Sequence, residues 1–446
     1  MENRYAEIAR ACGVVGAGGA GFPTHVKLDA RVEYLVINGA ECEPLMTVDQ
    51  VLLLRYAREL VRTADGLRAA LGAVEARFGV KAKHAGAVDV LRRAAEGYSQ
   101  VRVVELEDRY PAGDEYVLVY EAAGRQIPQG GIPLDCGVVV VNVETLWNLW
   151  RGEDGGVLTH KWVTVAGEVA RPGTYRVPLG VTVGEMLDLA GGALIPQYRV
   201  LNGGPMMGRL VETQEEPVTK TTKGLLVLPE GSPAVLNRLR PIEHMLRLAQ
   251  SVCCQCRMCT DLCPRNLLGY GIHPNKTILA AGYQWSVGAG AAEEALLCSE
   301  CGACDMYACP MGLSPRRING MLKGLLSRER VPAPDRGKQV QADPWRPYRR
   351  IPTQRLVRRL GLEGYHSPAE WIATDWSPRR VILPLRQHIG APAEPIVGAG
   401  ELVSAGQQIA CIPEGALGSA LFASITGTVT AVSGTAITIE ATRGEA

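Results

Sequence analysis

The sequence has no apolar run of the roughly 18 residues that a membrane helix requires. It also has no excess of either charge, since 47 Lys and Arg residues balance 46 Asp and Glu residues. These absences argue against membrane insertion, against a general nucleic-acid binder and against a polybasic membrane anchor. The N-terminus shows no apolar core of a signal peptide, so the sequence predicts a cytoplasmic protein.

The chain of 446 residues is too long for one ordinary domain, and roughly two to four domains are expected. Hydrophobic residues make up 47% and charged residues 21%, values that exclude a largely disordered chain. The 13 cysteines are then the strongest compositional feature. In the cytoplasm we expect them as thiols, metal ligands or redox groups rather than as disulfides.

Short apolar runs and turn signals predict the secondary structure of the first 150 residues. Residues 32–37 and 137–141 are short and rich in β-branched residues, which predicts two buried strands. Thr47-Val-Asp-Gln50 fits a capping box with Thr47 as the N-cap and Gln50 reaching back. The helix that follows should end near Leu71, with Gly72 as its C-cap. This alternation indicates α/β layering.

The remaining regions differ in pattern. Beyond residue 158 a small α+β module is expected, with strands at 161–169 and 174–177 and a helix at 182–190. Residues 326–380 are rich in Arg, Pro and Trp and are expected to connect two domains. The C-terminal region, 381–446, contains short strands such as 408–412 and 427–432, which indicate a small all-β unit.

Eight cysteines fall into two runs with the spacing of iron–sulfur ligands. The first run follows C-x2-C-x2-C-x3-C-P, the bacterial ferredoxin pattern for a [4Fe-4S] cluster. The second run has the same first spacings and one extra residue before its last cysteine. The two runs are Cys253, Cys256, Cys259 and Cys263, and Cys298, Cys301, Cys304 and Cys309.

In two-cluster ferredoxins, the fourth cysteine of each run ligates the other cluster. We therefore expect Cys309 to complete the cluster of the first run, and Cys263 to complete that of the second. The alternative is a pair of structural zinc sites, which usually take ligands in two Cys-x-x-Cys or Cys-x-x-His pairs. Cys254 does not fit the spacing and is expected to be a bystander. Two adjacent clusters would conduct single electrons.

A glycine-rich loop lies near the N-terminus. Gly16-Ala-Gly18-Gly-Ala-Gly21 matches G-x-G-x-x-G, which requires a preceding strand and a following helix to indicate a Rossmann fold. The preceding segment instead looks helical, and Pro23 does not suit a helix already begun, so we reject a Rossmann fingerprint. The loop could still cradle a phosphate or a flat ring, or be a plain flexible turn.

Several motifs resemble the flavin-bearing subunit of respiratory complex I and its relatives. Residues 18–24 closely resemble the family motif GGAGFPT. Residues 36–44, 110–115 and 141–146 are similar to its Asn- and acid-rich loop, its Gly-Glu-Glu segment and its VNNVETL stretch. These motifs occur in the family's order and cover most of residues 13–150. One departure is Gly-Asp-Glu in place of Gly-Glu-Glu.

The resemblance implies an FMN site and a site for the NADH that reduces the flavin. Gly18, Gly19 and Gly21 would pack against flavin and nucleotide, and Lys27 would meet the FMN phosphate or support the loop. Asp114 and Glu115, which follow Gly113, are the candidate catalytic residues beside the nicotinamide. The other implied cofactor contacts are Asn38 and Glu41 at the ribityl chain or ring edge, and Asn142 and Thr145 near the phosphate.

Further resemblances narrow the family. Residues 158–210 look like an SLBB (soluble-ligand-binding β-grasp) domain, and parts of 381–446 resemble the barrel-sandwich, lipoyl-like domain of the C subunit of the Rnf complex. In that protein the barrel-sandwich comes first, whereas here it comes last. This order of domains is similar to that of the cobalamin reductases of propanediol-utilisation microcompartments. The resemblance to these reductases extends over nearly the whole chain. Residues 381–446 contain no Lys, so lipoyl or biotin attachment is excluded.

The predicted protein is multidomain, α/β and α+β. Its expected parts are an FMN/NADH-binding α/β domain of the complex I type (1–157), an SLBB β-grasp domain (158–210), a connector (211–240), a helical ferredoxin-like domain with two [4Fe-4S] clusters (241–325), a linker (326–380) and a barrel-sandwich β domain (381–446).

The predicted function is electron transfer from NADH through FMN and two [4Fe-4S] clusters to a one-electron acceptor. The resemblance implies cobalamin as that acceptor and a bacterial microcompartment as the location. A redox protein, a microcompartment shell protein or an adenosyltransferase would be a partner. Two alternatives remain: an electron carrier or docking module without NADH oxidation, and the C subunit of an Rnf-type ion pump.

Overall fold

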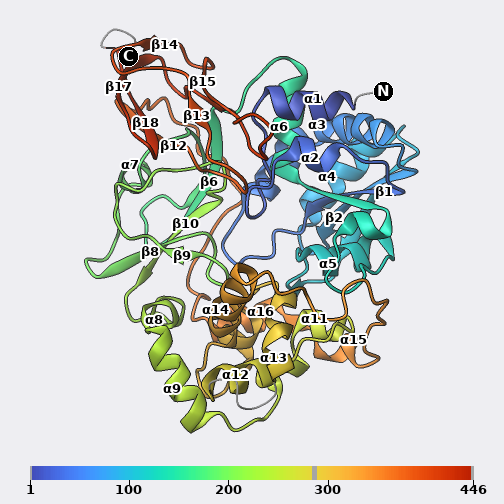
Figure 1. The fold of residues 1–446 in the computed structure, drawn as a ribbon. Helices are drawn as coiled ribbons and strands as arrows, with labels where there is room; N and C mark the ends of the chain where they lie inside the picture. The colour runs from blue at the N-terminus through green and yellow to red at the C-terminus, as the bar shows by residue number, and fades with distance from the viewer. Residues whose placement is uncertain (1–2, 284–288, 443–446) are drawn as a thin grey trace.

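The computed structural model describes residues 3–283 and 289–442. Four modules can be followed in Figure 1: an N-terminal α/β module, a middle β module, a helical cysteine module and a C-terminal β module. The predicted mixed α/β architecture is thereby confirmed. No helix within these residues combines the length and the apolar character needed to cross a bilayer.

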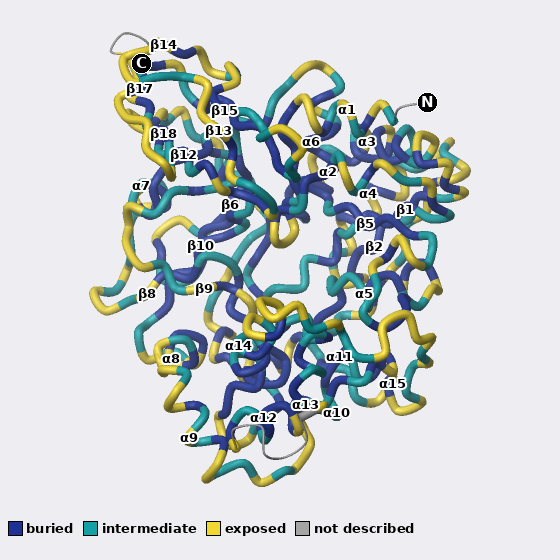
Figure 2. Tube along the Cα trace, viewed as in Figure 1, coloured by how far each residue is buried: buried dark blue, intermediate teal, exposed yellow. Residues whose placement is uncertain are grey.

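The N-terminal α/β module is built on a four-stranded parallel sheet. The strands lie in the order β3-β2-β1-β5, and the runs at 32–37 and 137–141 supply β1 and β5 as predicted. Because both faces of a parallel sheet are covered, β1 and β5 are mostly buried (Figure 2), whereas the edge strand β3 is partly exposed. The bounds are β1 (Tyr34–Gly39), β2 (Glu75–Lys81), β3 (Val101–Leu106) and β5 (Val138–Asn142).

Helices cover this sheet. The long helix α3 packs on α4 and α6, and Gly72 follows it with φ of +69°, as the predicted C-terminal glycine requires. The glycine loop joins two helices, α1 and α2, which confirms that it is not a Rossmann turn. The bounds are α1 (Arg4–Ala11), α2 (Thr24–Leu28), α3 (Val48–Ala70), α4 (Ala85–Ala95), α5 (Glu115–Leu118), η1 (Val119–Ala123), η2 (Pro133–Cys136) and α6 (Val143–Glu153).

The middle β module is a five-stranded mixed sheet in the order β7-β6-β10-β8-β9. Its central strand β10 lies in the stretch 211–240 that the sequence predicts as a connector, so the sheet extends past residue 210. Helix α7 begins with a capping box between Thr182 and Glu185. The bounds are β6 (His160–Gly167), β7 (Gly173–Pro178), α7 (Val183–Leu189), β8 (Tyr198–Asn202), β9 (Arg209–Leu210) and β10 (Gly224–Pro229).

Short helices form the helical cysteine module. The segment predicted as a linker packs beside it, where β11 pairs antiparallel with β4 of the N-terminal module. The bounds are β4 (Arg109–Tyr110), α8 (Pro233–Leu239), α9 (Ile242–Val252), α10 (Met258–Asp261), α11 (Pro264–Leu267), α12 (Pro274–Gly282), α13 (Ala289–Glu293), η3 (Glu294–Leu297), η4 (Cys304–Ala308), α14 (Pro315–Arg328), α15 (Arg346–Arg349), β11 (Ile351–Pro352) and α16 (Thr353–Arg359).

The C-terminal β module consists of two small sheets, β12-β18-β17-β14 and β13-β15-β16. Val381, Ile409 and Ile437 from this module share one buried core with Val163 and Leu225 of the middle module, so the two are packed together. The bounds are β12 (Arg380–Pro384), β13 (Glu394–Pro395), β14 (Leu402–Val403), β15 (Gln408–Cys411), β16 (Leu421–Phe422), β17 (Gly427–Val432) and β18 (Ala436–Ala441).

Candidate functional site

A cleft of about 800 Å³ lies where the N-terminal α/β, middle β and helical cysteine modules meet. The segments that carry the predicted flavin and nucleotide residues are far apart in the sequence, yet all of these residues line the cleft. They are Gly18, Gly19, Gly21, Lys27, Asn38, Glu41, Gly113, Asp114, Glu115, Asn142 and Thr145. The structure therefore brings the whole predicted set to one cavity, while the role of each residue stays a prediction.

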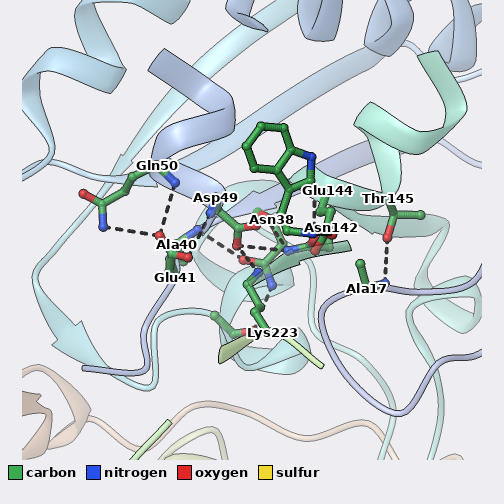
Figure 3. Close-up of polar contacts among 12 residues, drawn as sticks. Ala17, Asn38, Ala40, Glu41, Asp49, Gln50, Asn142, Glu144, Thr145 and Lys223 are labelled. Carbon is green, nitrogen blue, oxygen red and sulfur yellow. Dashed lines mark hydrogen bonds and ion pairs between the residues drawn. The ribbon is translucent and has the colours of Figure 1, made fainter. Parts of the chain in front are cut away.

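The glycine loop, residues 16–21, lines one side of the cleft. A hydrogen bond from Gly16 N to Phe22 O (2.9 Å) closes it, and Ala17 N donates to Thr145 Oγ1 (2.9 Å; Figure 3). A Cβ atom added at Gly19 would meet no atom within 4 Å. The tip of the loop therefore leaves its backbone bare, which suits the close approach of a flat ring or a phosphate.

Gly21 at the far end of the loop has a different environment. Its φ is +73°, and an added Cβ would lie 2.7 Å from Thr221 Cγ2 and 3.1 Å from His388 Cα. Contact with the neighbouring modules is thus sufficient to require glycine here. The predicted contact of Gly21 with a cofactor is not needed to explain the residue.

Glu41, and not Thr47, caps the N-terminus of α3 at the cleft. Glu41 Oε1 accepts a hydrogen bond from Asp49 N (2.8 Å) and Oε2 accepts one from Gln50 N (3.2 Å; Figure 3). The Thr47 side chain makes no capping bond and instead contacts Thr174 Oγ1 (3.0 Å) in the middle β module. The predicted capping box is therefore wrong, because a carboxylate from the preceding loop satisfies the free N–H groups of the helix.

A charged cluster joins two modules beside this helix end. Lys223 Nζ of the middle β module lies 2.6 Å from Asp49 Oδ2 (Figure 3). Burial and the Asp49 carboxylate raise the pKa of Glu41 to about 7, although Lys223 opposes this. Burial alone would lower the pKa of Lys223, but the attraction of Asp49 and Glu41 raises it overall.

Two buried polar atoms in the cleft wall have no hydrogen-bond partner, namely Thr24 Oγ1 and Asp49 Oδ1. Leaving such an atom unsatisfied costs on the order of 1–3 kcal/mol, so its presence beside a cavity points to a polar ligand. FMN offers hydroxyl, phosphate and ring N–H groups. The unpaired atoms, the bare glycine loop and the size of the cleft therefore fit a flavin nucleotide.

The two predicted asparagines fix the backbone around the cleft. Asn38 Nδ2 donates to Gly113 O (3.0 Å). Asn142 caps helix α6, since its Oδ1 accepts from Glu144 N (2.9 Å), and its Nδ2 donates to Asp49 Oδ2 (3.0 Å). Both residues thus have structural roles, and their predicted contacts with the ribityl chain and the phosphate stay predictions.

The candidate catalytic acids are both paired. Glu115 Oε1 lies 3.2 Å from Lys27 Nζ, which also donates to Val140 O (3.1 Å). Asp114 is nearly buried, and its Oδ2 lies 3.2 Å from Arg265 Nη2 of the helical cysteine module. Asp114 therefore contributes to the contact between modules, whereas Glu115 remains partly exposed at the cleft.

The predicted ligand cysteines surround two separate pockets. The inner pocket is lined by Cys263, Cys298, Cys301 and Cys304, and the outer pocket by Cys253, Cys256, Cys259 and Cys309. Each set joins three close cysteines of one run to the last cysteine of the other, as the spacing predicts. Cys254 also lines the outer pocket but is exposed.

Burial favours the neutral form of two of these thiols, Cys259 and Cys263. Burial, followed by the nearby thiols, raises the pKa of Cys259 to about 12, and burial also raises that of Cys263 to about 12. Cluster binding would therefore be coupled to loss of these protons. Among the described residues, no group of three or more His, Cys, Asp or Glu could hold a single metal ion. Four thiols line each pocket, which is the number of cysteine ligands that a [4Fe-4S] cluster takes.

Several cleft residues could not be found from the sequence. Thr24 and Asp49 lie inside motifs that the sequence marks as a loop and a helix start. The sequence therefore does not reveal that each has an unpaired polar atom in the cleft wall. Lys223 and Arg265 reach the cleft from other modules, and nothing in their local sequence indicates this. Only the folded arrangement brings these residues together.

Four family models match the chain in the order of its modules. Their descriptions are Nuo51 FMN-binding domain (9–151), SLBB domain (162–210), 4Fe-4S dicluster domain (252–314) and RnfC Barrel sandwich hybrid domain (364–443). The fold, the cleft and these matches define the class of protein. The chain is an electron-transfer oxidoreductase with an FMN-binding domain and an iron–sulfur domain.

Two curated relatives identify the family. Cobalamin reductase PduS of Salmonella typhimurium is 44% identical over 97% of this chain and 95% of its own length. The protein of the same name from Citrobacter freundii is 43% identical over the same shares of the two chains. The chain belongs to this cobalamin reductase family, which confirms the resemblance found in the sequence.

Two further matches are more distant in sequence. The C subunit of the Na⁺-translocating ferredoxin:NAD⁺ oxidoreductase complex of Acetobacterium woodii is 34% identical over 57% of this chain and 56% of its own. An NAD⁺-reducing [NiFe]-hydrogenase in the H2-reduced state has a TM-score of 0.50 and 24% identity, covering 74% of this chain and 62% of that chain. This last match supports the fold alone.

Proposed function

We propose that the chain oxidises NADH and passes the electrons through FMN and two [4Fe-4S] clusters to a one-electron acceptor. One observation carries this proposal. Cys298 and Cys301 line the inner pocket and also line the cleft that holds the predicted flavin residues. A flavin in the cleft would therefore lie beside a cluster in the inner pocket, with little protein between them.

Different residues of the cleft would bind different parts of FMN and NADH. The bare tip at Gly19, with the neighbouring Gly18, would lie against the flavin or the nucleotide, and Lys27 would meet the phosphate. FMN, when bound, accepts an electron pair from NADH and releases the electrons singly. Glu115, which is paired with Lys27, would orient the nicotinamide, while Asp114, Asn38 and Asn142 would keep the cleft in shape.

The two pockets suggest an order for the electrons. The inner pocket borders the cleft, and Cys263, Cys301 and Cys304 are buried. In the outer pocket Cys256 is exposed, and the adjacent Met258 and Met311 are also exposed. We propose that electrons enter at the inner cluster and leave from the outer cluster to an acceptor at the surface.

The acceptor proposed is cobalamin, in the cob(III)alamin or cob(II)alamin state, because the most similar relatives are named cobalamin reductases. Location in a bacterial microcompartment within the cytoplasm, with a shell protein or an adenosyltransferase as partner, rests on the sequence resemblance and belongs to the same proposal.

The test is an anaerobic spectral titration of the reconstituted protein with NADH. We expect flavin and iron–sulfur absorbance to bleach together, with roughly eight irons per chain. If flavin and iron are present but NADH bleaches neither, the chain is an electron carrier reduced by another protein. NADPH in a parallel titration would show the nucleotide preference.

A further inference from the structure

Gly13, three residues before the glycine loop, and Gly21 at its end both contact the C-terminal β module. Gly13 has φ of +67°, and a Cβ atom there would lie 2.7 Å from Ala420 O. At its end, Ile389 N donates to Gly21 O (3.3 Å). The tip between these two contacts is the part that faces the cleft.

Lys220 makes the central contact at Gly13, just before the loop. Its Nζ donates to Gly13 O (2.8 Å), Ala420 O (2.7 Å) and Ser419 Oγ (3.0 Å), so one ammonium group bonds the N-terminal module to the C-terminal β module. Ser419 Oγ donates to Gly13 O as well (2.9 Å). Lys220 is 1% exposed and Ser419 is 2% exposed.

Burial of the Lys220 ammonium group is unfavourable for the stability of the fold, so its contacts call for an explanation. A buried ammonium group loses its hydration, and here three oxygens without formal charge replace the water. Burial accordingly lowers the pKa of Lys220 to about 7. An apolar residue would avoid this desolvation, but it could not bind the Gly13 carbonyl and two atoms of another module at once.

We propose that the C-terminal β module positions the FMN-binding glycine loop, with Lys220 and Ser419 as the positioning residues. These two residues fix Gly13, and the His388–Ile389 backbone fixes Gly21, so the exposed tip between them is held in one conformation before the flavin arrives. Preorganisation of this kind lowers the entropy lost on binding. The inference rests on the proposed function in one respect, since it assumes that FMN binds in the cleft.

A matched pair of serines offers the test. Ser419 and Ser424 are both buried in the C-terminal β module, and each donates to a carbonyl of another module. Ser419 bonds to Gly13 at the loop, whereas Ser424 Oγ bonds to Leu179 O in the middle β module (2.6 Å). Ser419→Ala and Ser424→Ala thus remove the same chemical group from the same module, but only Ser419→Ala affects the loop.

The measurement is the FMN dissociation constant of the full chain with its clusters reconstituted, together with its thermal unfolding. We expect Ser419→Ala to weaken FMN binding roughly two- to fivefold and Lys220→Met roughly tenfold or more. Ser424→Ala should lower the unfolding temperature without changing FMN affinity. The cluster absorbance should be the same in all three variants, because the loop does not touch either pocket.

Equal FMN affinity in Ser419→Ala and wild type would overturn the inference, and so would equal weakening in both serine variants, which would indicate general loss of stability. Ser419→Ala decides the matter even if Lys220→Met does not fold. Wild-type protein that binds no FMN would contradict the proposed function instead, so the two failures are distinguishable.

Discussion

The inner and outer pockets have almost the same cysteine spacing, yet they differ in their surroundings. Three of the inner cysteines are buried, with exposed fractions of 8% for Cys263 and Cys301 and 9% for Cys304. In the outer pocket Cys256 is exposed and only Cys259 is buried. The two runs share a ligand spacing, so it is the packing of the other modules that places one cysteine pocket against the cleft and leaves the other nearer the surface.

The modules enclose the inner pocket by specific contacts. Tyr110 of the N-terminal module donates its hydroxyl hydrogen bond to Cys301 O. The middle β module approaches so closely that a Cβ atom at Gly302 would lie 2.9 Å from Met206 O. Arg265, two residues after Cys263, pairs with Asp114 at the cleft. The outer pocket has the exposed side chains of Met258 and Met311 near it instead.

The largest difference between the two pockets is expected when an inner ligand is removed, as in Cys301→Ala. Removing an inner ligand should interrupt the path at its entry, so NADH-dependent reduction of both the outer cluster and the acceptor should fall by more than about 100-fold. Stopped-flow absorbance and acceptor reduction would measure this. Cys12→Ala, which changes a buried cysteine outside both pockets, should retain the transfer; undiminished transfer in Cys301→Ala would contradict the order proposed.

Cys256→Ala should produce the opposite pattern. About half of the iron should be lost, while FMN stays bound and NADH still bleaches the flavin and the inner cluster. Acceptor reduction should fall by roughly tenfold or more, since electrons lose their exit. Iron analysis and the NADH titration would check this, with Cys254→Ala as the exposed control that keeps both clusters. Simultaneous loss of flavin at full solubility would contradict separate flavin and cluster sites.

Gly19→Val tests the flavin end of the same path. An added side chain would project into open space at the loop tip, so the chain should fold but bind FMN or NADH at least roughly tenfold more weakly. Flavin titration and NADH oxidation would measure the change. The control is Gly231→Val, because Gly231 also has no atom within 4 Å of an added Cβ. Retained flavin and NADH oxidation would refute the placement of the loop.

The smallest effect is expected on the reduction potentials. Arg265→Gln removes a positive charge near the inner pocket, which should lower the potential of the inner cluster by an amount on the order of tens of millivolts. Asp114→Asn removes its negative partner and should shift the same potential upwards. A redox titration followed by electron paramagnetic resonance would measure both shifts. A change in the outer cluster alone would show that the two pockets have been assigned in the wrong order.

Much of the local structure could be predicted because it depends on nearby residues. The β-branched runs became β1 and β5, Gly72 ended α3, and the helix expected at 182–190 formed as α7. The cleft residues were also predicted as one set, since their motifs resemble a known flavin family. Prediction failed where a more distant partner competes, as at α3, where Glu41 replaced Thr47 as the cap.

The sequence alone determined the cysteine spacing, the glycine loop, the order of the modules and the family. These are properties of short segments, in which backbone conformation and ligand geometry follow from adjacent residues. Only the tertiary structure decided that Lys223 meets Asp49, that Arg265 meets Asp114 and that Lys220 fixes Gly13. Each of these pairs joins residues that are far apart in the sequence, so the contact depends on how whole modules bury their surfaces against one another.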